Sequence, residues 1–231
     1  MNLIVFDMDG VLVDPTNSFR EATVEVIRHF TGRETTHDRI IEIKLEGGYN
    51  NNNDVAVRII EELGGRASLA EIRAYSQILF WGENRDGTGA ISREECLIEN
   101  GVLEELGENY RLGINTGRGI PGAKHSLDRW FPEIVFDPIM TCDNVERLKP
   151  EPDGLLQIME LLPDSKMVYV GDNIDDARCG RAAGVPFIGV AGANAIRRDE
   201  IVELFNAEGA VAIVESVNEL PVLMETLTVG A

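Results

Sequence analysis

The stretch that decides the fold is the amino-terminal segment MNLIVFDMDGVLVD, residues 1–14. Asn2 to Phe6 form an apolar, β-branched run that ends abruptly in Asp7-Met8-Asp9-Gly10. Such a run predicts a buried strand that delivers charge to one edge of a sheet. Two carboxylates two residues apart, followed by a glycine, suit a hard cation and leave one oxygen free as a nucleophile. An ordinary strand followed by an acidic turn explains this stretch alone equally well.

The composition is that of a globular protein and argues against some partners. The 231 residues are 44% hydrophobic and 26% charged, enough for one large domain or for a core domain with a smaller one. The formal net charge of −19 argues against nucleic acid and against anionic membranes as partners. A small phosphorylated ligand stays compatible with this charge if a metal and local cations offset it.

The cysteines and the amino terminus predict a cytoplasmic location. Cys96, Cys142 and Cys179 are isolated and form no CxxC motif, which favours a reducing compartment over disulfides or a zinc site. The first apolar run lacks a basic flank and is too short for a signal peptide, and no stretch approaches membrane-spanning length. The sequence carries no signal for an oligomeric state.

Periodicity divides the chain into two parts. Residues 15–90 show four apolar patterns at helical spacing, separated by glycines, and predict a small all-α insertion. Thr36 and Ser68 are expected to begin the second and the fourth of these helices. Residues 92–106 are expected to form a helix that is broken or kinked near Asn100-Gly101. Strands and helices then alternate, and one of these strands is expected at residues 134–136. This alternation predicts a Rossmann-like α/β core of residues 1–14 and 91–231, with a parallel sheet covered by helices on both faces.

Three further strand ends carry polar residues, and two of them are ambiguous. Thr116 and Gly117 follow the predicted strand Arg111–Asn115 and offer a hydroxyl and N–H groups to an anion. Lys149, restrained by neighbouring prolines just before a predicted helix, offers a fixed positive charge to a phosphate or an aspartate. Alone, the first is equally an N-cap turn, and the second an exposed lysine in a proline-rich loop.

The remaining strand end is strongly acidic. Asp172, Asp175 and Asp176 follow the apolar strand Met167–Val170. Carboxylates gathered in this way need a cation to neutralise them, although the helix dipole also favours acids in a first helical turn. Because Asp172 precedes the helix proper, the dipole explains it less well than a cation does.

Together, the four strand ends predict one site. The carboxyl ends of parallel strands meet at one edge of an open α/β sheet, where ligands bind. The residues expected at this edge are Asp7, Asp9, Thr116, Lys149, Asp172 and Asp176. They comprise a nucleophile, a metal-binding acidic group, a phosphate-binding hydroxyl and a cation. That set is the equipment for phosphoryl transfer through an aspartyl-phosphate.

The order of these motifs resembles the haloacid dehalogenase superfamily. DMDGVLVD is similar to its first motif, Thr116 to its second, Lys149 to its third and residues 171–176 to its fourth. The resemblance covers residues 2 to about 190. The helical insertion directly after the first motif resembles the C1-type cap of subfamily I, the branch that includes phosphoglycolate phosphatase and β-phosphoglucomutase. It implies an α/β core with a helical cap at residues 15–90.

The resemblance implies a role for each acidic residue. Asp7 would attack phosphorus and also ligate Mg²⁺. Asp9 would be the general acid/base, with its backbone carbonyl as a metal ligand. Asp172 would complete the metal site and Asp176 would support it. Asp175 stands where many relatives have asparagine or glycine. Whether Asp175 or Asp176 faces the ion therefore stays open.

The same resemblance implies the phosphate contacts. Thr116 and the N–H groups of Met8 and Gly117 would hold the phosphoryl oxygens. Lys149 would orient Asp7 and offset its charge, while Mg²⁺ would reduce the repulsion of a phosphate dianion. The aspartate at position 9 is typical of phosphatases and mutases rather than of dehalogenases, phosphonatases or ATPase pumps.

The predicted cap supplies the candidates for substrate specificity. Gly48, Tyr49 and Asn50 belong to a loop rich in glycine and asparagine that suits hydroxyls or a polar leaving group. Arg20 and Arg118 are candidate anion contacts. The alternatives are a solvated loop with a helix cap, and arginines that form surface salt bridges.

These observations lead to the hypothesis of a Mg²⁺-dependent phosphatase acting on a small phosphorylated metabolite. A phosphosugar mutase of the β-phosphoglucomutase kind would use the same core residues. A response-regulator receiver shares the acidic pocket, threonine and lysine, but Asp9 and the helical insertion argue against it. A non-catalytic binding protein would not need every motif residue.

Overall fold

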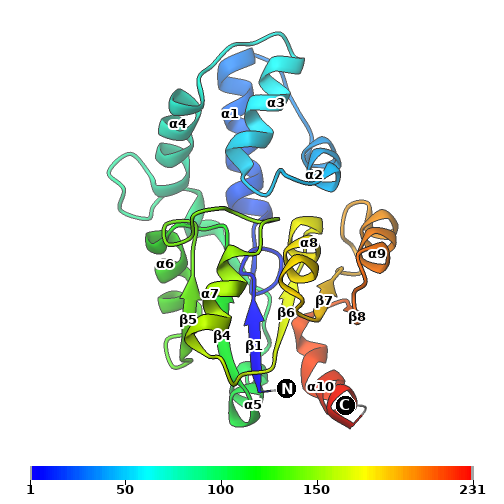
Figure 1. Cartoon of the computed structure of the whole chain (residues 1–231). Coiled ribbons are helices and arrows are strands. Elements are labelled where there is room, and N and C mark those ends of the chain that lie inside the picture. The colour runs from blue at the N-terminus through cyan, green and yellow to red at the C-terminus, as the bar shows by residue number, and fades with distance from the viewer. Residues whose placement is uncertain (1, 230–231) are drawn as a thin grey trace. The chain divides into compact units, whose positions relative to one another are not determined.

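The computed structural model describes residues 2–229, which belong to two compact units (Figure 1). One unit comprises the chain up to Val13 and from Cys96 onwards, and the other comprises Asp14–Glu95. Residues 15–90, predicted as an insertion, lie within the second unit. The chain passes between the units at two short strands, β2 (Val13–Asp14) and β3 (Glu95–Cys96), which pair in a two-stranded sheet.

A six-stranded parallel sheet forms the centre of the first unit, in the order β5-β4-β1-β6-β7-β8. Along the chain these strands are β1 (Leu3–Phe6), β4 (Arg111–Asn115), β5 (Phe136–Met140), β6 (Met167–Gly171), β7 (Phe187–Val190) and β8 (Ala212–Val214). Every residue of β1, β6 and β7 is buried, which explains why these strands are continuous apolar runs. The predicted Rossmann-like α/β fold is confirmed.

Helices cover both faces of this sheet. The face that includes Ile4 and Phe6 packs against α5 (Val102–Asn109), α6 (Ile120–Trp130) and α10 (Leu220–Val229). The opposite face packs against α7 (Asp153–Leu161), α8 (Ile174–Ala183) and α9 (Arg198–Ala207). On that face the rings of Tyr169, Phe187 and Phe205 contact one another in sequence.

The strand register brings the ends of β1, β4 and β6 level. Phe6 lies opposite Ile114 on one side and Val170 on the other. The residues that follow these three positions therefore emerge together at one edge of the sheet. This alignment places the polar motifs that end each strand beside one another.

The second unit is helical. After a π-helical turn at Thr16–Arg20 it contains α1 (Glu21–Thr31), α2 (His37–Glu46), α3 (Asn52–Glu62), α4 (Leu69–Trp81) and a 3₁₀ turn at Ala90–Arg93. The predicted start signals are confirmed, because Thr36 and Ser68 accept hydrogen bonds from the first turns of α2 and α4. Gly32 ends α1 in a left-handed conformation with φ 67°. None of the helices within residues 2–229 is both long and apolar enough to cross a membrane.

Two expectations about local structure are wrong. The first half of the predicted helix 92–106 contains β3 instead, and α5 begins only after Gly101, whose φ is 92°. Leu97 N–H donates to Leu12 O at 3.0 Å rather than to a helical carbonyl. The strand predicted at 134–136 is β5, which starts at Phe136 and contains Pro138. An edge strand tolerates this proline because one of its sides needs no N–H donor.

Candidate active site

The candidate site begins where β1 ends. Asp7 is 4% exposed, and its N–H donates to Val170 O at 2.8 Å, which fixes the end of β1 against β6. The chain then turns at Gly10, whose φ is +72°. A Cβ at this position would clash with the Asp172 carboxylate. A glycine is therefore required here, both for the backbone conformation and for the close approach of Asp172.

Three carboxylates gather at this edge of the sheet. Asp7, Asp172 and Asp176 each offer an oxygen within 4.8 Å of the others. Burial raises the pKa of Asp7 from 3.8 to about 6. The Lys149 ammonium opposes this rise, whereas the Asp176 and Asp9 carboxylates add to it. The Lys149 ammonium therefore does not fully offset the effect of burial on the pKa of Asp7.

This cluster fits a hard divalent cation. Asp7 Oδ1 is buried and accepts no hydrogen bond from residues 2–229, and all the side chains of the cluster offer oxygen, the donor that Mg²⁺ prefers. The protein itself holds both oxygens of Asp176, since Oδ2 accepts from Asn173 N–H at 3.1 Å and Oδ1 accepts from two further groups. Asp175 is also buried, but it is not a member of the cluster found among the described residues.

Lys149 connects the acids to the sheet. Its side chain is 5% exposed, and Nζ lies 3.1 Å from Asp7 Oδ1 and 2.7 Å from Asp176 Oδ1. Its hydrogen bonds go to Asp176, to Tyr169 Oη at 3.1 Å and to Asn115 O at 3.4 Å. Asp7 therefore faces the lysine charge without receiving its hydrogen bond. Burial lowers the pKa of Lys149, but the Asp176 and Asp7 carboxylates raise it by more, so the lysine stays charged.

Tyr169 belongs to this network, although the sequence analysis missed it. Its fully buried hydroxyl donates to Asp176 Oδ1 at 2.5 Å and lies 3.2 Å from Asn115 O. Burial raises the pKa of Tyr169 well above its usual value, and the Asp176 and Asp7 carboxylates raise it further. The tyrosine therefore stays a hydrogen-bond donor. The signal in the sequence is one hydroxyl in the otherwise apolar stretch MVYV, residues 167–170.

Thr116 and Gly117 lie at the end of β4, as predicted. Thr116 is 3% exposed, and its N–H donates to Met140 O at 2.9 Å. A small cavity is lined by Thr116, Gly117 and Lys149 together with part of the loop before α7. The structure thus brings the predicted hydroxyl, backbone donor and lysine to one place.

Arg118 and Asp9 form a bidentate ion pair. Arg118 Nη2 lies 2.6 Å from Asp9 Oδ1, and Nε lies 3.0 Å from Oδ2. The Arg118 side chain is 1% exposed and that of Asp9 is 29% exposed. The arginine also donates from Nη1 to Ser126 Oγ of α6 at 2.7 Å. A surface salt bridge, one alternative for Arg118, does not describe this buried guanidinium.

The other residues predicted for substrate recognition lie in the second unit. Arg20 donates to the threonine hydroxyl one turn earlier at 3.2 Å, and Tyr49 Oη accepts from Arg58 Nη1 at 3.1 Å. Gly48 adopts φ +80°, and Asn50 follows in the loop before α3. Contacts of these residues with a substrate stay a prediction.

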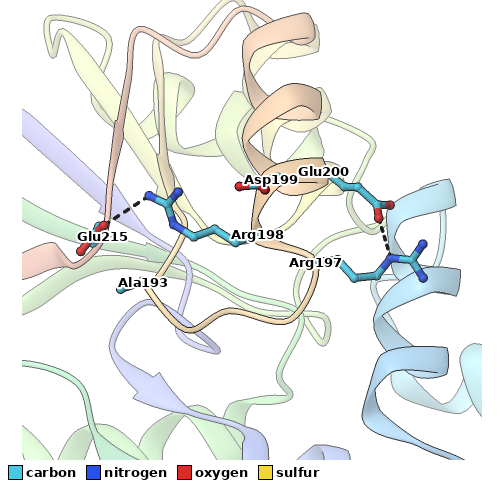
Figure 2. A pocket seen from close by; sticks show the side chains of 6 residues that line it. All are labelled: Ala193, Arg197, Arg198, Asp199, Glu200 and Glu215. Atoms are coloured by element: carbon cyan, nitrogen blue, oxygen red, sulfur yellow. Dashed lines mark hydrogen bonds and ion pairs between the residues drawn. The ribbon is translucent and has the colours of Figure 1, made fainter.

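A second hollow, of 490 Å³, lies beyond the carboxyl ends of β7 and β8 (Figure 2). It is lined by Ala193, Arg197, Arg198, Asp199, Glu200 and Glu215. Figure 2 shows Arg197 paired with Glu200 at 3.0 Å and Arg198 with Glu215 at 3.3 Å. Because acids outnumber arginines here and both arginines are paired, this lining does not suit a phosphate. None of the predicted site residues lines it.

Comparison with known proteins identifies the family. A model of the haloacid dehalogenase-like hydrolases matches residues 1–184. The chain belongs to this family. It is therefore a hydrolase, and among its relatives is the phosphoglycolate phosphatase of Cereibacter sphaeroides, 25% identical over 184 residues that cover 80% of this chain and 82% of that protein.

Two further matches place the hydrolase among its relatives. The imidazoleglycerol-phosphate dehydratase of Phytophthora nicotianae is 29% identical over 200 residues, which cover 81% of this chain. The hydrolase spans only 42% of that protein's length. The structure of a conserved haloacid dehalogenase-like protein from Agrobacterium tumefaciens superposes with a TM-score of 0.74 at 20% identity and covers 99% of both chains. This last likeness concerns the fold alone.

Proposed function

We propose that this hydrolase is a Mg²⁺-dependent phosphatase that hydrolyses a small phosphomonoester through an aspartyl-phosphate on Asp7. The observation that carries the proposal is the environment of Asp7. Its carboxylate is buried at a strand end, 3.1 Å from the Lys149 ammonium, and Oδ1 accepts no hydrogen bond from the described residues. A carboxylate oxygen that the protein leaves unsatisfied is available to bond phosphorus.

In the first step Asp7 attacks the phosphorus of the substrate. A bond forms between an Asp7 carboxylate oxygen and phosphorus, and the bond from phosphorus to the leaving oxygen breaks. The electron pair of that bond goes to the leaving oxygen, which takes a proton from the Asp9 carboxyl. The products are the free alcohol and a phosphorylated Asp7.

In the second step water attacks the phosphoryl group. Asp9, now a carboxylate, accepts a proton from the water as its oxygen bonds to phosphorus. The bond from phosphorus to Asp7 breaks, and its electron pair restores the Asp7 carboxylate. Inorganic phosphate leaves, and Asp9 carries the proton needed for the next turnover.

The remaining residues bind and neutralise the phosphoryl group. Thr116 Oγ and the N–H groups of Met8 and Gly117 hold its oxygens, and Lys149 offsets the charge beside Asp7. Mg²⁺ would be held by Asp7, Asp172 and Asp176 and by the backbone carbonyl of Asp9, where it would reduce the repulsion between the acids and the phosphate dianion.

Substrate choice and setting complete the proposal. We assign the helical residues 15–90 as a cap that selects the leaving group, with Arg20, Gly48, Tyr49 and Asn50 as candidate contacts. The relatives named as phosphatases and the lysine and threonine of the site support a small phosphorylated metabolite as the partner, and the isolated cysteines support the cytoplasm as the location.

A phosphate-release screen with Mg²⁺ tests the proposal. The relatives' names suggest phosphoglycolate and phosphomonoesters that carry an imidazole ring as two arms, beside sugar and polyol phosphates. Wild type should release phosphate from at least one class, and Asp7→Asn should release at least about 10³-fold less. Asp128→Asn is the matched control, because its carboxylate is 62% exposed and pairs with Lys124 along α6.

The outcomes separate the alternatives. Activity that survives in Asp7→Asn contradicts the nucleophile and the aspartyl-phosphate. Isomerised product instead of free phosphate, when a sugar bisphosphate is added, identifies a phosphosugar mutase with the same core residues. No product of either kind across the screen contradicts both enzymatic proposals.

A further inference from the structure

The ion pair between Arg118 and Asp9 is bidentate, and its guanidinium is buried, unlike that of a surface pair. The guanidinium uses Nε and Nη2 for the two Asp9 oxygens, at 3.0 and 2.6 Å, and Nη1 for Ser126 Oγ at 2.7 Å. Its side chain is 1% exposed, and Ser126 is fully buried. A buried guanidinium is stable only when its donors are satisfied, so this geometry is strongly specified.

The backbone of Arg118 is fixed as well. Its N–H donates to Thr116 Oγ1 at 3.2 Å, and its carbonyl accepts from Cys142 N–H at 3.0 Å. The turn after β4 therefore holds both the hydroxyl proposed to bind phosphate and the arginine that binds Asp9. One rigid segment thus sets the position of the phosphate and that of the Asp9 carboxylate.

Asp9 is held at its buried side and open at the other. Each carboxylate oxygen has two lone pairs, and Arg118 occupies one on each. The Asp9 side chain keeps 29% of its surface exposed, so the remaining lone pairs stay available for proton exchange. A planar fork that binds both oxygens also fixes the plane of the carboxylate, which a lysine cannot do.

We infer that Arg118 is a positioning residue that holds the Asp9 carboxylate in the orientation required for both of its proton transfers. The inference rests on the proposed function, in which Asp9 protonates the leaving oxygen and later accepts a proton from water. The leaving oxygen of the first step and the water oxygen of the second step occupy the same side of phosphorus, opposite Asp7. A single fixed carboxylate plane therefore serves both, and a freely rotating Asp9 would serve both poorly.

Arg118→Lys tests this role, since it keeps the charge and removes the fork. Two probes of similar shape are used, phenyl phosphate and p-nitrophenyl phosphate, beside the phosphomonoester that the screen turns over fastest. Because a residue that acts through Asp9 does not contribute to substrate binding, we expect kcat to fall about 100-fold with KM changed by less than about threefold. The loss should be larger for phenyl phosphate, whose leaving oxygen needs the proton more.

The two steps can also be separated in time. Nitrophenolate leaves without a proton, so the variant should still phosphorylate Asp7 and then hydrolyse the phosphoenzyme slowly. We expect a burst of about one nitrophenolate per enzyme before slow turnover, with an amplitude larger than that of wild type. In the Asp9→Asn background, Arg118→Lys should change kcat by less than about twofold, because the arginine acts through Asp9.

Two further variants complete the test. Arg181→Lys is the matched control, because Arg181 pairs with Glu208 at 2.6 Å but is 62% exposed at the far end of α8. It should leave kcat unchanged. Ser126→Ala removes the hydroxyl that accepts from the third guanidinium nitrogen and leaves the fork on Asp9 in place, so it should lower kcat in the same sense by a smaller factor. It keeps the test usable if Arg118→Lys does not fold.

The outcomes distinguish this inference from the proposed function. Wild type that is active, with an Arg118→Lys or Ser126→Ala variant equal to it in kcat and burst, overturns the positioning role alone. A variant whose KM rises while kcat holds assigns Arg118 to substrate binding and also overturns it. A wild type that is inactive on every probe overturns the proposed function itself.

Discussion

Asp7 and Asp9 stand two residues apart at the end of one strand, yet their surroundings are opposite. Asp7 is buried among other acids, carries a pKa raised to about 6 and has an oxygen without a hydrogen bond from the described residues. Asp9 is partly exposed, and Arg118 donates to both of its oxygens. Nothing in the local sequence DMD distinguishes these two environments.

The two different surroundings of Asp7 and Asp9 allow one strand end to support two kinds of chemistry. A nucleophile benefits from an oxygen that the protein leaves unsatisfied, because the incoming phosphorus then meets no competing donor. A proton carrier benefits from a fixed orientation, because proton transfer depends on geometry first. The protein creates the first environment by crowding acids around one lysine, and the second by burying an arginine.

The largest expected effect comes from removing the cation on the Asp7 side. Lys149→Met leaves Asp7 and Asp176 buried without their ammonium, and the loss of one partner of a buried ion pair costs about 3–5 kcal/mol. We expect the free energy of unfolding to fall by this amount in urea titrations at pH 7 without metal. Turnover should be lost as well.

Two comparisons control the lysine experiment. Arg147→Met alters a cation of the same loop that is 60% exposed, and it should change stability little. Adding Asp176→Asn to Lys149→Met removes the second partner and should restore part of the loss. Equal effects of Lys149→Met and Arg147→Met on the free energy of unfolding would contradict the claim that Lys149 stabilises the buried carboxylates of Asp7 and Asp176.

The same substitution at the two aspartates should have opposite effects on stability. The pKa of Asp7 is raised from 3.8 to about 6, so between these pH values the folded chain holds a proton that the unfolded chain has lost. Stability therefore falls as pH rises through this range, by up to about 3 kcal/mol. Asp7→Asn removes this loss and should stabilise the metal-free protein at pH 8 but not at pH 4.

Asp9→Asn should do the reverse. It deprives the buried Arg118 of its charged partner, so it should destabilise the protein at both pH values. The measurement is urea unfolding in a metal chelator at pH 4, 6 and 8 for both variants and wild type. A stabilised Asp9→Asn, or an Asp7→Asn without gain at pH 8, contradicts the contrast between the two residues.

The sequence predicts the Asp7 side better than the Asp9 side for a physical reason. Asp7 and Asp172 each follow a strand end, and parallel strands align their ends, so the local pattern is enough to bring these two together, while Lys149 stands next to Pro150 in the loop before α7. Arg118 also follows a strand end, but its burial depends on Asp9, 109 residues earlier, and on Ser126 of α6. No local pattern reports such a pairing.

Similar reasons account for the errors elsewhere. Caps and glycines marked the helices of the second unit, because these signals act within one turn. The helix predicted at 92–106 fails because Leu97 finds its backbone partner in the loop after β1, far away in the chain. The sequence pattern predicts Tyr169 only as part of an apolar strand, because its hydrogen-bond partners come from β4 and α8.

The Tyr169 hydroxyl should contribute least to stability, and its removal tests whether the Asp7 and Asp9 sides act separately. Tyr169→Phe removes the hydroxyl that donates to Asp176 Oδ1 at 2.5 Å and accepts from Lys149 Nζ at 3.1 Å. A hydrogen bond to a charged group contributes roughly 1.5 kcal/mol, so the free energy of unfolding should fall by this amount. Tyr110→Phe is the matched control, because its hydroxyl makes no hydrogen bond within residues 2–229.

If Tyr169 orients Lys149 beside Asp7, turnover of Tyr169→Phe should fall several-fold, whereas the nitrophenolate burst that reports on Asp9 should stay as in wild type. A burst in Tyr169→Phe that is larger than that of wild type would mean that the Asp7 and Asp9 sides of the strand end are coupled rather than separate.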